Sequence, residues 1–369
     1  MLKKYKFEIF LIFLLIINFY LIYLVFGFEP GGDGWGYIKQ TEILAGDPFL
    51  YQKGSLQDWG RAFLRPLGPI IGALFLPLTN NAFGAVLLQN LIFYLLTPFL
   101  FFYAAHCFFK QKRLAFYSTV FYICAYPYLK FTLNYMFDIG AWFFIVLSIL
   151  FTLKYLSVYK TDKKTANNIL LFNPVVCFLG FLMKESGGLG IGFFILVILL
   201  ATDFTLKEKI KKILIPIFLF SILLIFYEVA FYSSYHYYSF DFFSTISDTF
   251  PRTYNFSNIA KKLIAVFSLG WFYVVLGTHR IFKEKDRRKM MILLALIPIS
   301  FSFLFWSYQA ERLMYVAGPL LAFLAVIGIN IKRQGIKYRL TESLLIILFI
   351  AFNYLIDYLI SNFDILSFL

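Results

Sequence analysis

The sequence predicts an all-helical, polytopic membrane protein with about eleven transmembrane helices and a cytoplasmic N-terminus. Three observations predict this class. Of the 369 residues, 61% are hydrophobic and only 15% are charged, which leaves too little polar surface for a water-soluble particle. The apolar residues form runs of about 20, the length that crosses the hydrocarbon core of a bilayer. Most lysines and arginines lie in short loops between those runs.

The net charge of +14 raises the possibility of a nucleic-acid partner. The basic residues form no aromatic-interleaved face of the kind that binds nucleic acid. Their place between apolar runs is typical of cytoplasmic loops in membrane proteins. The predicted partner is therefore the lipid bilayer, and no nucleic-acid partner is expected.

Six basic clusters set the predicted orientation. All six are expected on the cytoplasmic side, so two crossings must separate each successive pair. The clusters lie at 3–6, 110–113, 154–164, 207–212, 280–289 and 332–339. The apolar run at 7–28 is longer than a secretory signal and has no small-residue cleavage site after it, so it is expected to be an uncleaved first helix.

The apolar runs supply the crossings that this orientation requires. The eleven predicted helices span about 7–28, 83–108, 113–131, 139–158, 167–183, 187–203, 213–233, 263–281, 290–307, 313–330 and 341–360. The segment 66–78 is short and rich in proline and glycine, and a full crossing there would reverse every later loop. We expect it to be a re-entrant or interfacial helix on the outer side.

The whole chain, 1–369, is predicted to be a single transmembrane domain with two long outer loops at 29–82 and 234–262. The first loop holds short interfacial helices, and residues 37–45 have the spacing of a helix on the membrane surface. The cytoplasmic loops are short and basic, so candidate functional residues gather on the non-cytoplasmic face.

The first outer loop contains an acid among glycines, in the stretch Glu29-Pro-Gly-Gly-Asp33-Gly-Trp-Gly-Tyr37. Glycines let the backbone turn sharply and approach a ligand closely while one carboxylate is presented. Asp33 is therefore a candidate catalytic group. The alternative is a turn acid or a helix N-cap.

Two arginines, Arg61 and Arg65, follow in the same loop, directly before the proline-started segment. Guanidinium groups at the membrane edge suit an anionic headgroup or a lipid phosphate. The alternative is a side chain that only reaches toward the interface from a lipid-facing position.

Three further polar positions lie in predicted outer turns. Asp138 begins the predicted helix at 139–158, where an acid either caps the helix or faces a polar cavity. Lys184 and Glu185 interrupt an apolar stretch, and the lysine either neutralises a phosphate or pairs locally. Arg312 opens the predicted helix at 313–330.

Taken in order, these motifs resemble those of the C-type (GT-C) integral-membrane glycosyltransferases. That group includes dolichyl-phosphate-mannose-dependent mannosyltransferases and lipid A aminoarabinose transferases. The matching features are an acid in the first outer loop, an Arg/Tyr-Pro-Leu-x-Pro segment, a second outer acid, a Lys-Glu turn and an outer arginine that heads a proline-containing helix. In this chain they are Asp33 followed by Tyr37, Arg65-Pro66-Leu67-Gly68-Pro69, Asp138, Lys184-Glu185, and Arg312 with Pro319.

The resemblance implies sugar transfer from a polyprenyl-phosphate donor to a glycan, lipid or protein acceptor, with inversion at the sugar. It implies that Asp33 is the base, that Asp138 orients the acceptor or the sugar, and that Lys184, Arg65 and Arg312 stabilise the phosphate, with Arg61 a weaker candidate. The site would face the non-cytoplasmic side of the cell membrane. From the sequence, the soluble C-terminal domain of the larger members is not expected in this chain. A divalent metal, Mg or Mn, is only weakly supported, because the first-loop acid stands alone and a hard cation requires several oxygen ligands.

Two other polytopic classes remain open from sequence alone. A lipid or sugar transporter or flippase predicts charged residues near the bilayer midplane and broken helices, whereas the notable polar groups inside the apolar runs are Gln89, Asn90 and Glu228. An O-antigen polymerase or ligase predicts its largest outer loop late in the chain, whereas here the most polar outer loop is the first. A non-catalytic membrane subunit with the same fold is a third alternative.

Overall fold

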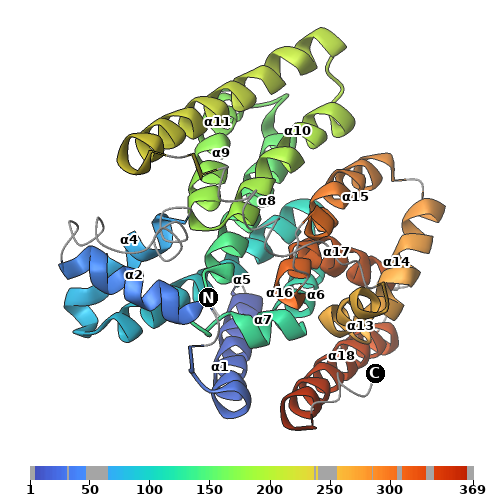
Figure 1. The fold of residues 1–369 in the computed structure, drawn as a ribbon. Helices are drawn as coiled ribbons and strands as arrows, with labels where there is room; N and C mark the ends of the chain where they lie inside the picture. The colour runs from blue at the N-terminus through green and yellow to red at the C-terminus, as the bar shows by residue number, and fades with distance from the viewer. Residues whose placement is uncertain are drawn as a thin grey trace.

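The computed structural model describes residues 5–30, 33–46, 65–236, 238–239, 256–284, 286–305, 310–329 and 336–363. Within these ranges every regular element is helical (Figure 1). The α-helices are α1 (Lys6–Phe26), α2 (Gly34–Gly46), α4 (Leu67–Thr79), α5 (Ala82–Phe109), α6 (Lys112–Ile123), α7 (Tyr126–Phe131), α8 (Asp138–Val158), α9 (Lys163–Met183), α10 (Gly190–Ala201), α11 (Leu206–Tyr235), α13 (Phe256–Phe267), α14 (Gly270–Glu284), α15 (Arg287–Ser300), α16 (Glu311–Met314), α17 (Gly318–Ile329) and α18 (Ile336–Phe363).

The predicted class, an all-helical multi-pass membrane protein, is confirmed. In the described ranges, six helical stretches are long and apolar enough to cross a membrane, and a seventh results if the bent pair α13 and α14 is taken as one span. The six are Lys6–Phe26, Ala82–Phe109, Asp138–Val158, Lys163–Met183, Leu206–Ser233 and Glu311–Ile329. The number eleven and the orientation stay predictions.

Two predicted helices are broken in the structure. The run at 113–131 divides into α6 and α7, and Ala125 between them has an extended backbone. Pro127 in the first turn of α7 has no N–H to donate to the preceding turn, so a continuous helix is interrupted there. The run at 263–281 contains a bend of 88° between α13 and α14, with Ser268 in the left-handed region at φ 46°.

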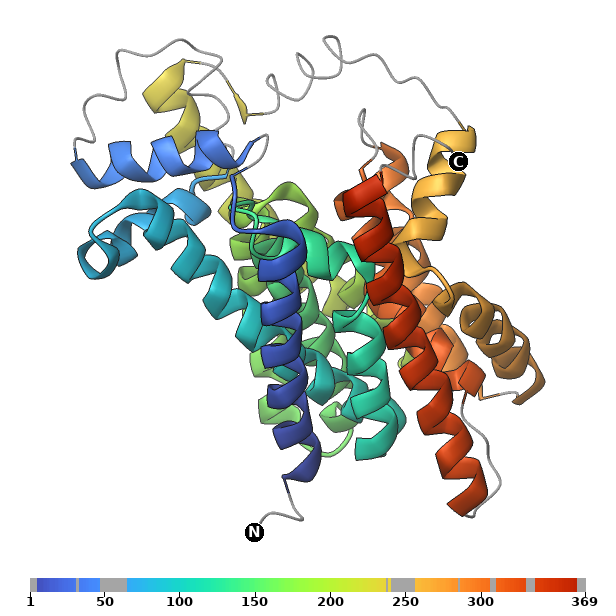
Figure 2. The same cartoon turned by 90° about the horizontal axis from the view of Figure 1, so that it is seen from below.

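Helices α2 and α4 lie across one end of the bundle instead of along it (Figure 2). Helix α4 has thirteen residues, so its length is about 20 Å, well short of the hydrocarbon core. Asn80, in the left-handed conformation, ends α4, and the Asn81 side chain caps α5 by accepting a hydrogen bond from the Gly84 N–H. The short helices predicted for the first loop are thus present.

The buried centre of the molecule is formed by α5, α8 and α17, whereas α1 and α11 are exposed along much of their length. The ring of Phe323 on α17 stacks on Phe101 and Phe108 of α5, with centroid distances of 5.5 and 4.6 Å. Helices α1 and α18, from opposite ends of the chain, both pack on α6 (Figure 2). At the N-terminal end of the central helix α8, Phe137 contacts Tyr37 of α2 and Gly68 of α4.

Candidate functional site

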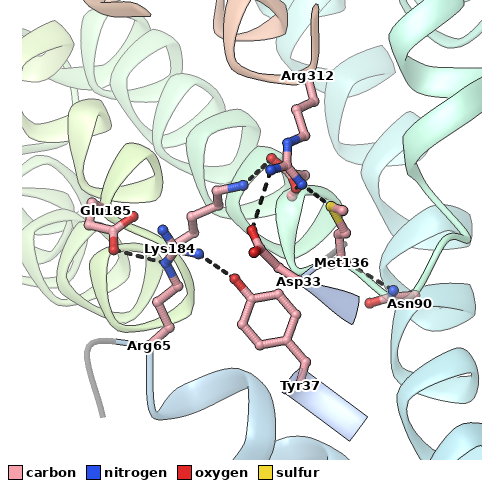
Figure 3. A network of polar contacts seen from close by, with 9 residues as sticks. Asp33, Tyr37, Arg65, Asn90, Met136, Lys184, Glu185 and Arg312 are labelled. Carbon is pink, nitrogen blue, oxygen red and sulfur yellow. Dashed lines mark hydrogen bonds and ion pairs between the residues drawn. The ribbon is translucent and has the colours of Figure 1, made fainter. Parts of the chain in front are cut away.

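Charged side chains from several separate elements meet at the N-terminal end of α8 (Figure 3). The turn before α2 supplies Asp33, α2 supplies Tyr37, and Arg65 lies two residues before the start of α4. The first residue of α8 is Asp138, and the connection between α9 and α10 supplies Lys184 and Glu185. The last member is Arg312, on the short helix α16.

Asp138 is the centre of this network and is only 2% exposed. The Lys184 ammonium forms an ion pair with Asp138 Oδ1, and Arg312 Nη1 lies 3.7 Å from Asp138 Oδ2. The carboxylate also lies at the N-terminus of α8, where the helix dipole favours negative charge. Two cations and a helix end therefore stabilise the buried charge.

Arg312 links the buried acid to a more accessible one. Its Nη2 lies 3.4 Å from Asp33 Oδ2, and the Asp33 side chain is 40% exposed. The Tyr37 N–H donates to the Asp33 carbonyl over 3.1 Å, which places Asp33 at the start of α2. Of the two acids that contact Arg312, Asp33 is therefore the one that a ligand can reach.

Arg65 forms the second half of the network. Its Nε donates to Glu185 Oε1 over 2.8 Å, and its Nη1 donates to the Tyr37 hydroxyl. The Tyr37 ring stacks on Phe137, directly before Asp138, with a centroid distance of 4.1 Å. A Cβ on Gly68 would overlap the Phe137 ring, so glycine in the Arg-Pro-Leu-Gly-Pro segment is what lets α4 approach the site.

The position of Lys184 follows from the way α9 ends. The residue itself is extended, at φ −167° and ψ 142°, and its carbonyl accepts a hydrogen bond from the Gly187 N–H over 2.7 Å. The backbones of Gly180 and Gly187 are so close that a Cβ on either would overlap the other. This tight turn directs the lysine side chain inward, where it is only 4% exposed.

Burial changes the acid–base properties of two site residues. It lowers the pKa of Lys184 to about 8, against the opposing attraction of Asp138, while Arg312 lowers it further. Burial also raises the pKa of Tyr37, so its hydroxyl stays protonated at neutral pH. The lysine charge is therefore present at neutral pH and is lost at moderately alkaline pH.

Seven residues named from the sequence thus lie together, in two groups of side-chain contacts joined by the hydrogen bond from the Tyr37 N–H to the Asp33 carbonyl. They are Asp33, Tyr37, Arg65, Asp138, Lys184, Glu185 and Arg312. Arg61 lies outside the described residues. The roles assigned to these side chains stay predictions.

Sequence reasoning gave no role to two neighbours of the network. Asn90 on α5 is fully buried and donates to the Met136 carbonyl over 3.0 Å, which fixes the segment before Asp138. The sequence does indicate that Asn90 is special, because a polar residue inside a spanning helix usually has a specific partner. Phe137, on which Tyr37 stacks, gave no sequence signal, since it is one of 49 phenylalanines.

The described residues of the network do not by themselves provide a ligand set for a divalent metal ion. A hard cation requires several oxygen ligands, and no group of three His, Cys, Asp or Glu side chains with metal-ligand spacing occurs among the described residues. Asp138 has a cation against each oxygen, and Asp33 faces Arg312. A metal would have to displace these side chains.

Comparisons of sequence identify no relative, because no protein-family model and no curated protein sequence matches the chain. Comparisons of structure do. The apo oligosaccharyltransferase of Archaeoglobus fulgidus superposes with a TM-score of 0.62 at 13% identity, over 97% of this chain and 56% of that one. ArnT from Cupriavidus metallidurans, bound to undecaprenyl phosphate, superposes with a TM-score of 0.65 at 13% identity, over 91% of this chain and 62% of that one.

The same oligosaccharyltransferase, tethered to an acceptor peptide, matches 98% of this chain with a TM-score of 0.60 at 13% identity. The chain thus covers less than two thirds of the length of the solved structures it resembles. Both of those proteins are GT-C glycosyltransferases. At this identity the likeness concerns the fold, and the chain has the fold of the GT-C membrane glycosyltransferases.

Proposed function

We propose that this protein is a membrane glycosyltransferase that moves a sugar from a polyprenyl-phosphate donor to an acceptor on the non-cytoplasmic face of the cell membrane. The observation that carries the proposal is the charged network at the start of α8. Its members come from segments far apart in the sequence and include both a reachable carboxylate and three cations. The GT-C fold supports the same reading.

In the proposed reaction the carboxylate of Asp33 accepts the proton of an acceptor hydroxyl. The freed oxygen forms a bond to the anomeric carbon of the sugar as the bond from that carbon to the phosphate oxygen breaks. The electron pair of the broken bond leaves with polyprenyl phosphate. A single displacement of this kind inverts the anomeric carbon. Asp33 suits the role because it is 40% exposed while its neighbour Asp138 is buried.

The departing phosphate gains charge in the transition state, so cations placed near it accelerate the reaction. Arg65, Lys184 and Arg312 are the proposed cations. Each is now paired with a carboxylate, and a donor phosphate would take over part of that pairing. Asp138 is proposed as a positioning residue, because its two cationic neighbours leave it no freedom to receive a proton.

A shallow apolar groove on the two helices that carry the first-loop residues supports a lipid donor. Its volume is about 370 Å³, and it lies between α2 and α4, the helices that position Tyr37 and Arg65. Its lining is apolar throughout: Leu44, Ala45, Ile70, Ala73, Leu74, Leu76 and Pro77. An isoprenoid chain in this groove would bring its phosphate toward Arg65. The ArnT structure, which contains undecaprenyl phosphate, is consistent with such a donor.

A transfer assay with purified full-length protein tests the proposal. The protein receives a panel of radiolabelled undecaprenyl-phosphate sugars together with an envelope extract as acceptor, with and without EDTA. We expect label to pass from the donor to the extract, equally in both conditions. Asp33→Asn should reduce turnover by roughly a hundredfold or more, the usual contribution of a general base.

The matched control is Glu42→Gln, because Glu42 is an exposed carboxylate on the same helix α2. It should transfer sugar at the normal rate. Unchanged turnover in Asp33→Asn would remove the base assignment. Binding of the donor with no transfer to any acceptor, combined with movement of the lipid across vesicles, would favour a flippase instead.

A further inference from the structure

A second polar cavity lies at the opposite end of α8. Helix α8 has 21 residues, so its ends are about 31 Å apart, and the network around Asp138 lies at its first residue. The cavity is lined by residues of its last turns together with the end of α10 and the beginnings of α11 and α15. Its volume is about 620 Å³, within the usual range of ligand pockets. The two sites are therefore separate.

The lining of this cavity is strongly basic. Four cations line it, Lys160, Lys209, Arg287 and Arg288, and Asp203 is the only acid in the lining. Asp203 already has a partner, because its Oδ2 accepts a hydrogen bond from the Lys160 ammonium over 2.6 Å. The cavity therefore carries an excess of positive charge.

The other three cations form no ion pair with a carboxylate within 4 Å in the described part of the chain, although the charge of Arg288 acts on Asp203 at longer range. Lys209 donates to the Leu199 carbonyl over 2.6 Å, and Arg288 donates to the Leu156 carbonyl. Nearby acids have other partners: Glu208 forms the capping box of α11 with Thr205, and Asp286 pairs with Lys289 over 2.9 Å. Backbone carbonyls hold two of the cations at the cavity without neutralising them.

Part of the lining is apolar. Leu156, Leu200, Phe204 and Met291 contribute to it. Leu200 is 41% exposed, and Leu206, outside the lining at the first residue of α11, is 70% exposed. The lining therefore combines cations with apolar side chains, and an exposed leucine follows it in the sequence.

We propose that this cavity binds the phosphate group of an anionic phospholipid or of a soluble phosphate ester, at the end of the molecule opposite to the transferase site. The general preference for lysine and arginine in cytoplasmic loops explains why the loops at this end carry positive charge. It does not explain why cations from separate segments of the chain line one half-open cavity together with four apolar side chains. The inference does not depend on the proposed sugar transfer.

The test measures lipid binding to the full-length protein in neutral detergent by native mass spectrometry. Short-chain phosphatidylglycerol and phosphatidylcholine are compared, and glycerol 1-phosphate and inorganic phosphate are added as soluble competitors. The pocket variant is Lys209→Gln with Arg287→Gln. The matched control is Lys164→Gln with Lys211→Gln, which removes two charges from the same end of the molecule outside the lining.

We expect saturable binding of phosphatidylglycerol and weak binding of phosphatidylcholine. The dissociation constant for phosphatidylglycerol should be about 30-fold higher in the pocket variant, because two cations are removed and each cation near a lipid surface contributes about a factor of five. Competition by millimolar glycerol phosphate identifies a soluble ester as a ligand, and its absence identifies the lipid; both outcomes support the site. An equal loss in the control variant, or no loss in the pocket variant, overturns it. Melting temperatures confirm that both variants are folded.

Discussion

Asp138 and Asp33 contact the same guanidinium, yet their surroundings differ. Asp138 is 2% exposed and lies between Lys184 and Arg312, whereas Asp33 is 40% exposed. Removal of a charge from a buried pair leaves its partner uncompensated, which costs far more than loss of an exposed pair. The buried acid is therefore expected to matter for stability and the exposed acid for chemistry.

Asp138→Asn should destabilise the fold by about 3 kcal/mol or more, because Lys184 and Arg312 lose their shared counter-charge. The melting temperature of the purified protein in detergent measures this. Asp203→Asn is the matched control, since that carboxylate is 76% exposed in its pair with Lys160 and its loss should leave the melting temperature unchanged. Equal melting temperatures for the two variants would contradict the central role of Asp138.

The lowered pKa of Lys184 predicts a pH dependence of donor binding. The ammonium is charged below pH 8 and neutral above it, so its attraction for phosphate is present at pH 7 and is lost as the pH rises through about 8. An undecaprenyl-phosphate sugar is a phosphodiester, whose charge is constant in this range. Its dissociation constant should rise about tenfold between pH 7 and pH 9.

Lys184→Arg supplies the control for this pH dependence, because a guanidinium stays charged throughout the range. Binding measured by competition with a fluorescent polyprenyl phosphate should then be flat from pH 7 to pH 9. A rise of the same size in both proteins would assign the titration to another group.

Most members of the network were recognisable from the sequence, because charged residues at the ends of apolar runs are rare and conspicuous. Their burial was not recognisable. The burial of Asp138 depends on how close α4 and α16 come to the start of α8, which in turn depends on contacts such as Gly68 against Phe137. Contacts of this kind leave no periodic pattern.

At the scale of elements, the crossing of α14 and α17 depends on two glycines. A Cβ on Gly277 would overlap the Leu324 carbonyl, and a Cβ on Gly328 would overlap the Tyr273 carbonyl. Small residues of this kind let the backbones of membrane helices approach closely. The closest approach of these two helices therefore leaves no room for any larger side chain.

Gly277→Ala should destabilise the protein by about 1–3 kcal/mol, because the added methyl forces the two helices apart. Gly192→Ala on α10 is the control, since a Cβ there meets nothing within 4 Å. Thermal unfolding in detergent compares the two. If Gly277→Ala has the same melting temperature as the wild type, the backbone contact between α14 and α17 does not limit stability.

Helix positions were largely predictable from hydropathy, while helix breaks were not. The predicted run at 139–158 corresponds to α8 and that at 83–108 to α5, each within a residue at either end. The division of 113–131 was not predicted, although a proline such as Pro127 interrupts a helix. The bend near Ser268, where φ is 46°, lies beside Gly270, on which a Cβ would overlap the rings of Phe267 and Phe349.

At the scale of the whole molecule, orientation decides whether the proposed function is feasible. Lys164 lies at the start of α9 and Lys184 at its end, so the two lie at opposite ends of a spanning helix. With the native cysteines replaced, Lys164→Cys should react with an impermeant maleimide only after the cells are opened. Lys39→Cys on α2 should react in intact spheroplasts. The reverse pattern would place the charged network on the cytoplasmic side.

The charged network has one more property, which follows from its composition. Among the described residues its three acids and three cations balance, since Asp33, Asp138 and Glu185 face Arg65, Lys184 and Arg312. A neutral cluster has almost no long-range field, so it cannot steer a charged ligand from the aqueous phase. The donor must instead arrive by diffusion in the plane of the membrane. Its association rate should therefore vary less than twofold between about 0.02 and 0.5 M salt, where an electrostatically steered encounter slows steeply.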